Sequence, residues 1–233
     1  MKRIILFACL LAAMPAFAQS SDFKMPSEIK FERTAVQKIT DKKTTMLTYY
    51  FTVNGDYAAL KPEAKDNTMI IYTKEGNMLI VSEKEKTIVV MNMKGILNMA
   101  KEIAENHASK DSLKEKASSR KTGNTKSISG YTAEEYEVTT EKGKMNLWYA
   151  KVDFNSVLAM TMGMMKGPGG KSAYPGQDLG DLPTPDKGRY MVQVDKDGKT
   201  VLETLSIDKT DFKFSTAGYT VRDMSSMMKG NSQ

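Results

Sequence analysis

Three short apolar runs that follow one another closely limit most strongly what this chain can fold into. They are Met69–Tyr72, Met78–Val81 and Ile88–Met91, each of strand length, and the segments between them, such as Lys74–Asn77, are of hairpin size. The runs therefore predict an antiparallel meander. They are apolar at consecutive positions instead of alternating ones, which is typical of strands whose two faces are both covered.

Other parts of the chain also have the pattern of strands. Residues 46–53 alternate between two faces and end at a turn, Asn54–Asp56. Further strands are predicted at Lys126–Ser129, Glu134–Thr140, Lys144–Lys151, Gly188–Asp195, Thr200–Ile207 and around Phe212 and Phe214. The small, basic residues of Ala117–Thr125 predict a connector.

Two segments have helical character. Lys94–Lys116 carries an apolar stripe that includes His107, and Asn155–Met165 is apolar almost all round. Gly167–Lys187, rich in Gly and Pro, is predicted to be a long loop. About ten strands with two inserted helices predict one α+β domain. Because so long a sheet does not stay flat, we expect a strongly curled, half-open antiparallel barrel with the helices as a lid.

The first 18 residues have the pattern of a secretory signal peptide. Lys2 and Arg3 precede an apolar run, and Ala16-Phe17-Ala18 forms a small-x-small exit. We expect cleavage near Ala18 and export to the periplasm or beyond. The predicted organisation is a signal peptide at 1–18, a flexible lead at 19–28, a single domain at 29–224 and a flexible tail at 225–233.

Composition excludes several kinds of chemistry for the mature chain. The single cysteine, Cys9, lies inside the signal peptide, and His107 is the single histidine, so thiol catalysis and cysteine or multi-histidine metal sites are excluded. No second apolar run is long enough to span a membrane. The net charge of +6 comes from interspersed lysines and acids, which favours an ordinary solvated surface over a nucleic-acid-binding face.

No motif predicts an enzyme. Glu134 and Glu135 are adjacent on a strand and should point to opposite faces, while Asp178, Asp181 and Asp186 lie in the predicted loop without a partner. His107 lies on the apolar stripe of its helix, which favours a structural role. We therefore expect no catalytic residue, no metal site and no cofactor.

The methionines are the one unusual feature of the composition. Of the 18 methionines, four lie within Met160–Met165, and this flexible, polarizable side chain suits surfaces that accept varied apolar shapes. The helix is either a lid over an apolar pocket or a plug that fills the core. The residues we predict to line such a pocket are Ile71, Val89, Trp148, Leu158, Met160 and Met164.

The order of elements, together with two phrases of sequence, resembles a known group of proteins. The phrases are Ile128-Ser129-Gly130-Tyr131, which leads to Glu135-Tyr136-Glu137-Val138, and Leu147-Trp148-Tyr149, and the ending Phe212-Lys213-Phe214 with Gly218-Tyr219 is similar too. Over roughly Phe31 to Met224 the chain resembles an uncharacterised family of exported bacterial proteins, known only as a domain of unknown function, in the lipoprotein-carrier (LolA-like) superfamily. The resemblance implies an incomplete barrel with a helical lid over an apolar cavity that holds acyl chains.

These observations predict a non-enzymatic periplasmic protein that binds an apolar ligand, a lipid or an acyl chain, on the concave side of the curled sheet. The alternative is an interaction module that docks an envelope protein through its methionine-rich helix or through its tail, Met224–Met228.

Overall fold

A computed structural model describes residues 24–40, 44–63, 68–93, 118–140, 143–156 and 188–224. All fourteen elements that these residues form are strands. They are β1 (Glu28–Lys30), β2 (Arg33–Thr40), β3 (Thr44–Phe51), β4 (Tyr57–Pro62), β5 (Thr68–Thr73), β6 (Asn77–Ser82), β7 (Thr87–Asn92), β8 (Ser118–Ile128), β9 (Tyr131–Thr140), β10 (Gly143–Lys151), β11 (Arg189–Lys196), β12 (Lys199–Lys209), β13 (Lys213–Ser215) and β14 (Thr220–Asp223).

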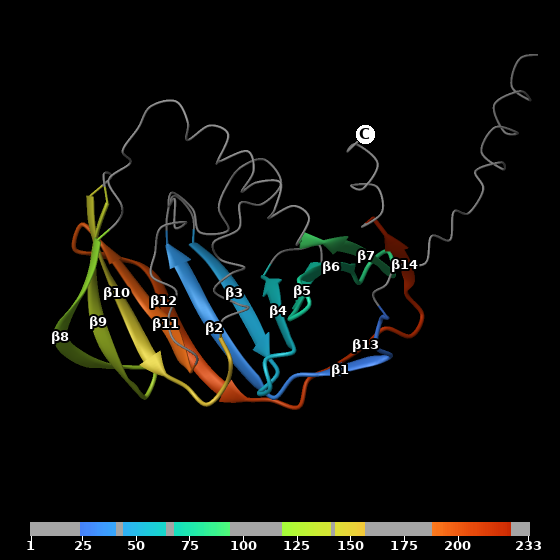
Figure 1. The fold of residues 1–233 in the computed structure, drawn as a ribbon, viewed down its shortest axis with the longest axis horizontal. Helices are drawn as coiled ribbons and strands as arrows, with labels where there is room; N and C mark the ends of the chain where they lie inside the picture. The colour runs from blue at the N-terminus through green and yellow to red at the C-terminus, as the bar shows by residue number, and fades with distance from the viewer. Residues whose placement is uncertain are drawn as a thin grey trace, which may run out of the picture.

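Twelve of these strands form one sheet, in the order β14-β7-β6-β5-β4-β3-β2-β12-β11-β10-β9-β8. Every pairing in it is antiparallel except that of β14, which runs parallel to β7. Figure 1 shows the sheet spread across the view from β8 to β14, with the ribbon of β1 and β13 below β5, β6 and β7. The antiparallel meander predicted from the three apolar runs is confirmed as β5, β6 and β7.

The pairing of β2 with β12 joins the two halves of the sheet. Its register runs from Arg33 opposite Lys209 to Ile39 opposite Leu202. On one side of this pair, β2 to β7 follow in chain order, and on the other side β12 to β8 follow in reverse order. A strand near the N-terminus therefore holds a strand near the C-terminus at the centre of the sheet.

The two faces of β5, β6 and β7 are both apolar but are covered differently. Met69, Ile71, Leu79, Val81, Ile88 and Val90 point to one face and are fully buried, because the β1–β13 ribbon packs Ile29, Phe31 and Phe214 against them. The residues between them point to the opposite face, which we call the inner face. The consecutive apolar runs in the sequence thus reflect two different environments.

The inner face continues over β2, β3 and β4, where it carries the larger apolar core. Cross-strand partners place Ala35 beside Tyr49 and Tyr49 beside Leu60, and Leu60 lies opposite Ile70 of β5. All of these except Ile70 are buried. The buried residues of this face on β2, β3 and β4 are Ala35, Gln37, Ile39, Leu47, Tyr49, Phe51, Ala58 and Leu60.

The prediction of an α+β fold with a strongly curled, half-open barrel is wrong. The sheet is open, with β14 and β8 at its two edges, and the described residues contribute strands alone. The register shifts in β8, β10, β11 and β12 bend these strands locally, and the sheet stays open because its two edge strands do not pair with each other. The predicted helices at 94–116 and 155–165 lie almost wholly outside the described residues.

Several strand boundaries also differ from the sequence prediction. The segment Ala117–Thr125, predicted to be a connector, is largely part of β8, because its polar residues occupy an edge strand where both faces can meet water. Strands β1, β2, β4 and β14 were not predicted.

Neighbouring isoleucines on β5 test the difference between the two faces. Ile71 is 0% exposed under the ribbon, whereas Ile70 is half-buried on the inner face. We expect Ile71→Ala to lower the free energy of unfolding by about 2–5 kcal/mol, the range for a filled core site, and Ile70→Ala to cost less than half as much. Urea unfolding of both variants measures this. Equal losses would mean that the inner face is as tightly packed as the ribbon side.

Candidate functional site: an apolar strip on the inner face

A strip of six half-buried apolar side chains lies on the inner face of β5, β6 and β7. The residues of this inner strip are Ile70, Tyr72, Met78, Ile80, Val89 and Met91. The strand register arranges them in two rows: Ile70 lies opposite Ile80, which lies opposite Val89, and Tyr72 lies opposite Met78, which lies opposite Met91. The inner strip therefore presents continuous apolar surface over three strands.

Tyr72 shows how apolar the surroundings of the inner strip are. Burial of its hydroxyl raises the pKa of Tyr72 to about 12, and no charged group contributes to that shift. Its ring packs against the buried core of β2, β3 and β4. The hydroxyl is therefore uncharged at neutral pH, and Tyr72 adds a neutral edge to the strip.

The structure separates the residues that the sequence predicted to line a pocket. Val89 lies in the inner strip, but Ile71 lies on the opposite face under the β1–β13 ribbon. Trp148 lies on β10, in the other half of the sheet. Leu158, Met160 and Met164 lie outside the described residues.

Sequence reasoning missed the other five members of the inner strip. In a run such as Met69–Tyr72 every residue is apolar, so the pattern does not say which residues face the ribbon. The signal that would have separated them is the register with β4, where Leu60 opposes Ile70 and alternates with the more polar Lys61. Because β4 was not predicted, that signal was not used.

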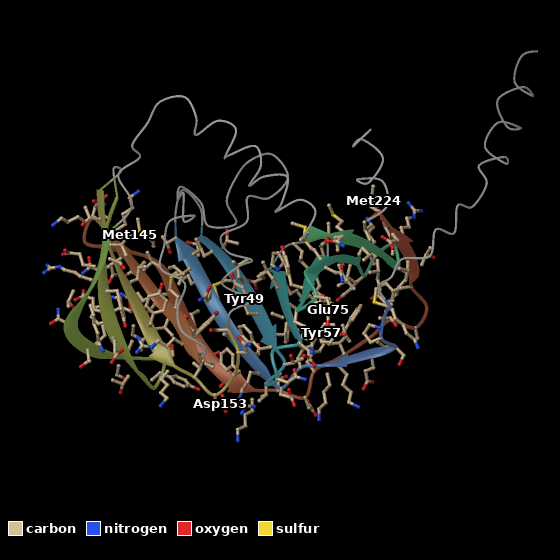
Figure 2. All side chains as sticks on the ribbon, in the orientation of Figure 1. Tyr49, Tyr57, Glu75, Met145, Asp153 and Met224 are labelled. Carbon is tan, nitrogen blue, oxygen red and sulfur yellow. The ribbon has the colours of Figure 1, made fainter. Side chains whose placement is uncertain are left out.

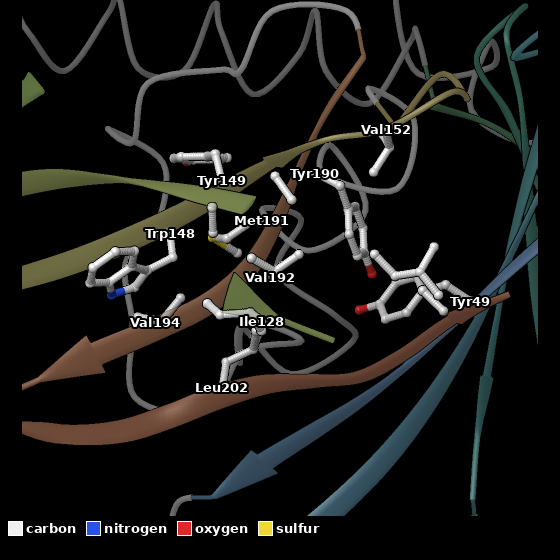
Figure 3. Close-up of a cluster of buried hydrophobic side chains, with 14 of the residues drawn as sticks. Tyr49, Ile128, Trp148, Tyr149, Val152, Tyr190, Met191, Val192, Val194 and Leu202 are labelled. Atoms are coloured by element: carbon white, nitrogen blue, oxygen red, sulfur yellow. The ribbon is translucent and has the colours of Figure 1, made fainter. Parts of the chain in front are cut away.

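Trp148 is buried in the larger apolar core, and its indole nitrogen also belongs to a polar network. Its indole Nε1 donates a hydrogen bond of 2.9 Å to Asp195 Oδ2. Lys126 Nζ lies 3.9 Å from the centre of its ring and 3.7 Å from the same carboxylate. Asp195 Oδ1 also accepts from Gln193 Nε2 at 2.6 Å and from Thr200 Oγ1 at 2.7 Å. Figure 3 shows the indole directed away from the tyrosines of the core.

Glu135 extends this network on the neighbouring strand. It lies opposite Trp148 and accepts hydrogen bonds from Thr122 Oγ1 and Asn124 Nδ2, both at 2.7 Å, and from Asn146. The donors from β8 reach it because the register shifts between Lys121 and Thr125. Every oxygen of this buried carboxylate therefore has a donor.

The environment keeps both carboxylates ionised. Burial alone would raise the pKa of Glu135, but the hydrogen bonds from Asn146, Thr122 and Asn124 together outweigh it and lower the pKa. The pKa of Asp195 is lowered in the same way, against burial, by Thr200, Gln193 and Trp148. Neither group is a proton donor at neutral pH, so this network stabilises the strands and offers no general acid.

The remaining acids of the described residues have no arrangement that suggests chemistry. Glu134 is paired with Lys121 at 2.8 Å and with Arg189 at 3.3 Å, and the hydrogen bond from Lys121 lowers its pKa despite some desolvation. Within the described ranges, no three His, Cys, Asp or Glu side chains gather as metal ligands. In the same part of the chain, no helix has the length and apolar character needed to cross a membrane.

The part of the chain that the structure describes forms one wide, open and mainly antiparallel sheet that carries an apolar strip, with a two-stranded ribbon beside it. Residues 34–216 match the family described as "Domain of unknown function (DUF4412)", and the chain belongs to that family. The predicted membership of an uncharacterised family is thereby confirmed. No curated protein matches the chain.

Solved structures match the chain at low identity and low TM-score. The chain is 13% identical to PNGF-II in its C2 crystal form, with a TM-score of 0.41, covering 85% of this chain and 32% of that one. An uncharacterised conserved protein from Thermus thermophilus is 9% identical, with a TM-score of 0.43, covering 83% of this chain and 90% of that one. The chain thus spans about a third of PNGF-II, and at these TM-scores the similarity indicates nothing about function.

The lowered pKa of Glu135 predicts how stability depends on pH. A carboxylate whose pKa is lower in the folded protein stabilises it above the ordinary value of 4.5, and this contribution is lost as the pH falls through the folded value. We expect Glu135→Gln to be less stable than the wild-type protein at about pH 7, and the difference to shrink steadily below pH 4.5.

Urea unfolding at a series of pH values measures this difference. Glu75→Gln, at an exposed glutamate between β5 and β6, is the matched control and should follow the wild-type curve at every pH. A gap between Glu135→Gln and wild type that stays constant with pH would show that the hydrogen bonds do not favour the ionised carboxylate.

Proposed function

We propose that this protein is an exported, periplasmic, non-enzymatic protein that binds an apolar ligand, a lipid or an acyl chain, on its inner strip. The observation that carries the proposal is the second apolar face of β5, β6 and β7. One face is fully used by the β1–β13 ribbon, whereas the six residues of the inner strip remain only half-buried. A row of apolar side chains that stay partly exposed on three neighbouring strands is a feature of surfaces that bind apolar partners.

The geometry of the strip suits an elongated ligand. Leu60, Ile70, Ile80 and Val89 lie in one row across four neighbouring strands. At a strand spacing of about 4.8 Å, this row extends for about 14 Å, the scale of an alkyl chain. Binding would gain on the order of 25 cal/mol for each Å² of apolar surface removed from water, before the cost of association.

Two features of the sequence support the wider proposal. The pattern of Met1–Ala18 is that of a secretory signal peptide. The resemblance to the lipoprotein-carrier superfamily links the family to proteins that hold acyl chains.

The methionines Met78 and Met91 add an adaptable surface to the strip.

A charge placed in the inner strip tests the site directly. We expect Ile80→Lys to weaken binding of the neutral fluorophore N-phenyl-1-naphthylamine at least tenfold, because a buried ammonium would lose its water when the ligand covers it. Leu205→Lys makes the same change at an exposed leucine of β12 and should leave the affinity unchanged. Fluorescence titration measures both, with circular dichroism as the check on folding.

Two results would contradict the proposal. One is equal binding by the folded Ile80→Lys variant and by wild type. The other is a clean unliganded mass in native mass spectrometry of protein purified from the periplasm, with no gain in melting temperature on adding fatty acids, fatty alcohols or lipopeptides.

A second candidate function is docking of an envelope protein at the end of the sheet. The short edge strand β14 carries Val221, which is 46% exposed, and Met224, which is 39% exposed, follows it. Figure 2 places Met224 and Met145 at opposite ends of the sheet. If this edge binds a partner, removing Asp223–Gln233, which takes the last residue of β14 with it, should abolish capture of that partner from an envelope extract while ligand binding stays unchanged. Capture that survives the truncation would exclude this edge.

A further inference from the structure

The sheet contains a local break between β11 and β12. Their register ends at Gln193 opposite Glu203, so Met191 has no partner on β12 and Thr204 has none on β11. Beyond this point β11 pairs with β10 alone, and β12 pairs with β2. The break leaves backbone carbonyl groups in the buried centre of the molecule that need hydrogen-bond donors from elsewhere.

Two side chains supply those donors. Gln37 Nε2 donates to the Met191 carbonyl oxygen at 3.0 Å, and Ser129 Oγ donates to the Thr204 carbonyl oxygen at 2.5 Å. Ser129 reaches this position from the turn between β8 and β9, where Ser129 and Gly130 both have positive φ, of 50° and 80°. This is the backbone geometry of a tight two-residue hairpin.

The bond to Met191 fixes the orientation of the Gln37 amide. A carbonyl oxygen only accepts, so the amide nitrogen of Gln37 must face Met191, and the same nitrogen donates to Thr204 Oγ1 at 3.2 Å. Gln37 Oε1 must therefore point elsewhere. Gln37 is 1% exposed, and among the described residues its Oε1 has no hydrogen-bond donor. A buried acceptor without a donor is rare in folded proteins and is costly to keep.

This acceptor lies on the same face as the inner strip. Gln37 alternates with Ala35 and Ile39 on β2 and lies opposite Leu47 of β3, all of which belong to the buried core of the inner face. Figure 3 shows the phenol oxygens of Tyr49, on β3, and Tyr190, on β11, directed toward one another. Ile70 lies on the third strand from β2, about 14 Å away at the usual strand spacing.

From this arrangement we infer that Gln37 Oε1 accepts a hydrogen bond from the polar end of the ligand, so that the ligand is an apolar chain with a neutral donor such as a hydroxyl group. The inference rests on the function proposed above. The apolar chain lies along the inner strip, and its head reaches Gln37 once the buried side chains between them, Leu60, Tyr49 and Leu47, shift to admit it.

The same acceptor selects against an anionic head. An ionised carboxylate has acceptor atoms only, so it offers no donor to Gln37 Oε1 and loses its water on burial. The side chains that the register places nearest to Gln37 on this face are Thr204, Leu47, Ala35 and Ile39, and none is a cation. A fatty alcohol should therefore bind more tightly than the matching fatty acid at neutral pH.

Matched ligands test the inference on the intact mature protein. We expect wild type to bind oleyl alcohol about tenfold more tightly than oleyl methyl ether, which has the same chain and lacks the donor, and to bind oleate more weakly than the alcohol. The Gln37→Leu variant should bind alcohol and ether with equal affinity. Gln193→Leu makes the same substitution at a glutamine of the Trp148 network and should keep the tenfold preference. Displacement of N-phenyl-1-naphthylamine measures each affinity.

The outcomes separate this inference from the proposed function. If wild type binds neither alcohol nor ether, the function itself is refuted. If wild type binds both equally, apolar binding stands and the role of Gln37 is refuted. A preference for the alcohol that survives in Gln37→Leu also refutes it, because another group is then the acceptor. The comparison of ligands on wild type requires no variant, so equal binding of alcohol and ether would still refute the role of Gln37 if Gln37→Leu does not fold.

Discussion

The ladder between β2 and β12 is the interaction on which the rest of the structure depends. It pairs residues 33–39 with residues 202–209 and so makes one sheet from two meanders that are far apart in the sequence. The ladder also positions the two residues beside the break between β11 and β12, since Gln37 lies on β2 and Thr204 lies on β12. The pairing of β2 with β12 therefore determines which face of the sheet carries the buried acceptor, Gln37 Oε1, and the inner strip.

The two halves of the sheet meet their burial requirements in different ways. The half with β5, β6 and β7 covers one face with a ribbon made from both ends of the described chain, β1 and β13, and retains an apolar strip on the other. The half with β8, β9, β10 and β11 instead carries two carboxylates that accept several hydrogen bonds each, the buried Glu135 and the half-buried Asp195. An apolar strip and a polar network are thereby separated along the length of a single sheet.

The sequence allowed the meander and most of the strands to be predicted, because period-two patterns and turn residues are local signals. Strand β2 was missed because Gln37 interrupts its alternation of apolar and polar residues. Gln37 faces inward because its amide donates to the Met191 carbonyl oxygen at the break between β11 and β12, which is far away in the sequence. The curled barrel was wrong because the closing of a sheet depends on which strands form its edges, and the parallel pairing of β14 with β7 has no local signature. In the candidate site, Val89 could be chosen from its apolar run, whereas Ile71 and Ile70 could be distinguished only by register.

The central position of β2 also constrains the order in which the protein can assemble. Its partner β12 begins at Lys199, and β14, which completes the other end of the sheet, begins only at Thr220. Until nearly the whole chain is present, the N-terminal meander has an open edge at β2 and another at β7, and such long-range pairing is intrinsically slow. During this interval the two unpaired edges can pair with those of a second unfinished copy, so the late strands protect the protein against self-association as well as completing its sheet.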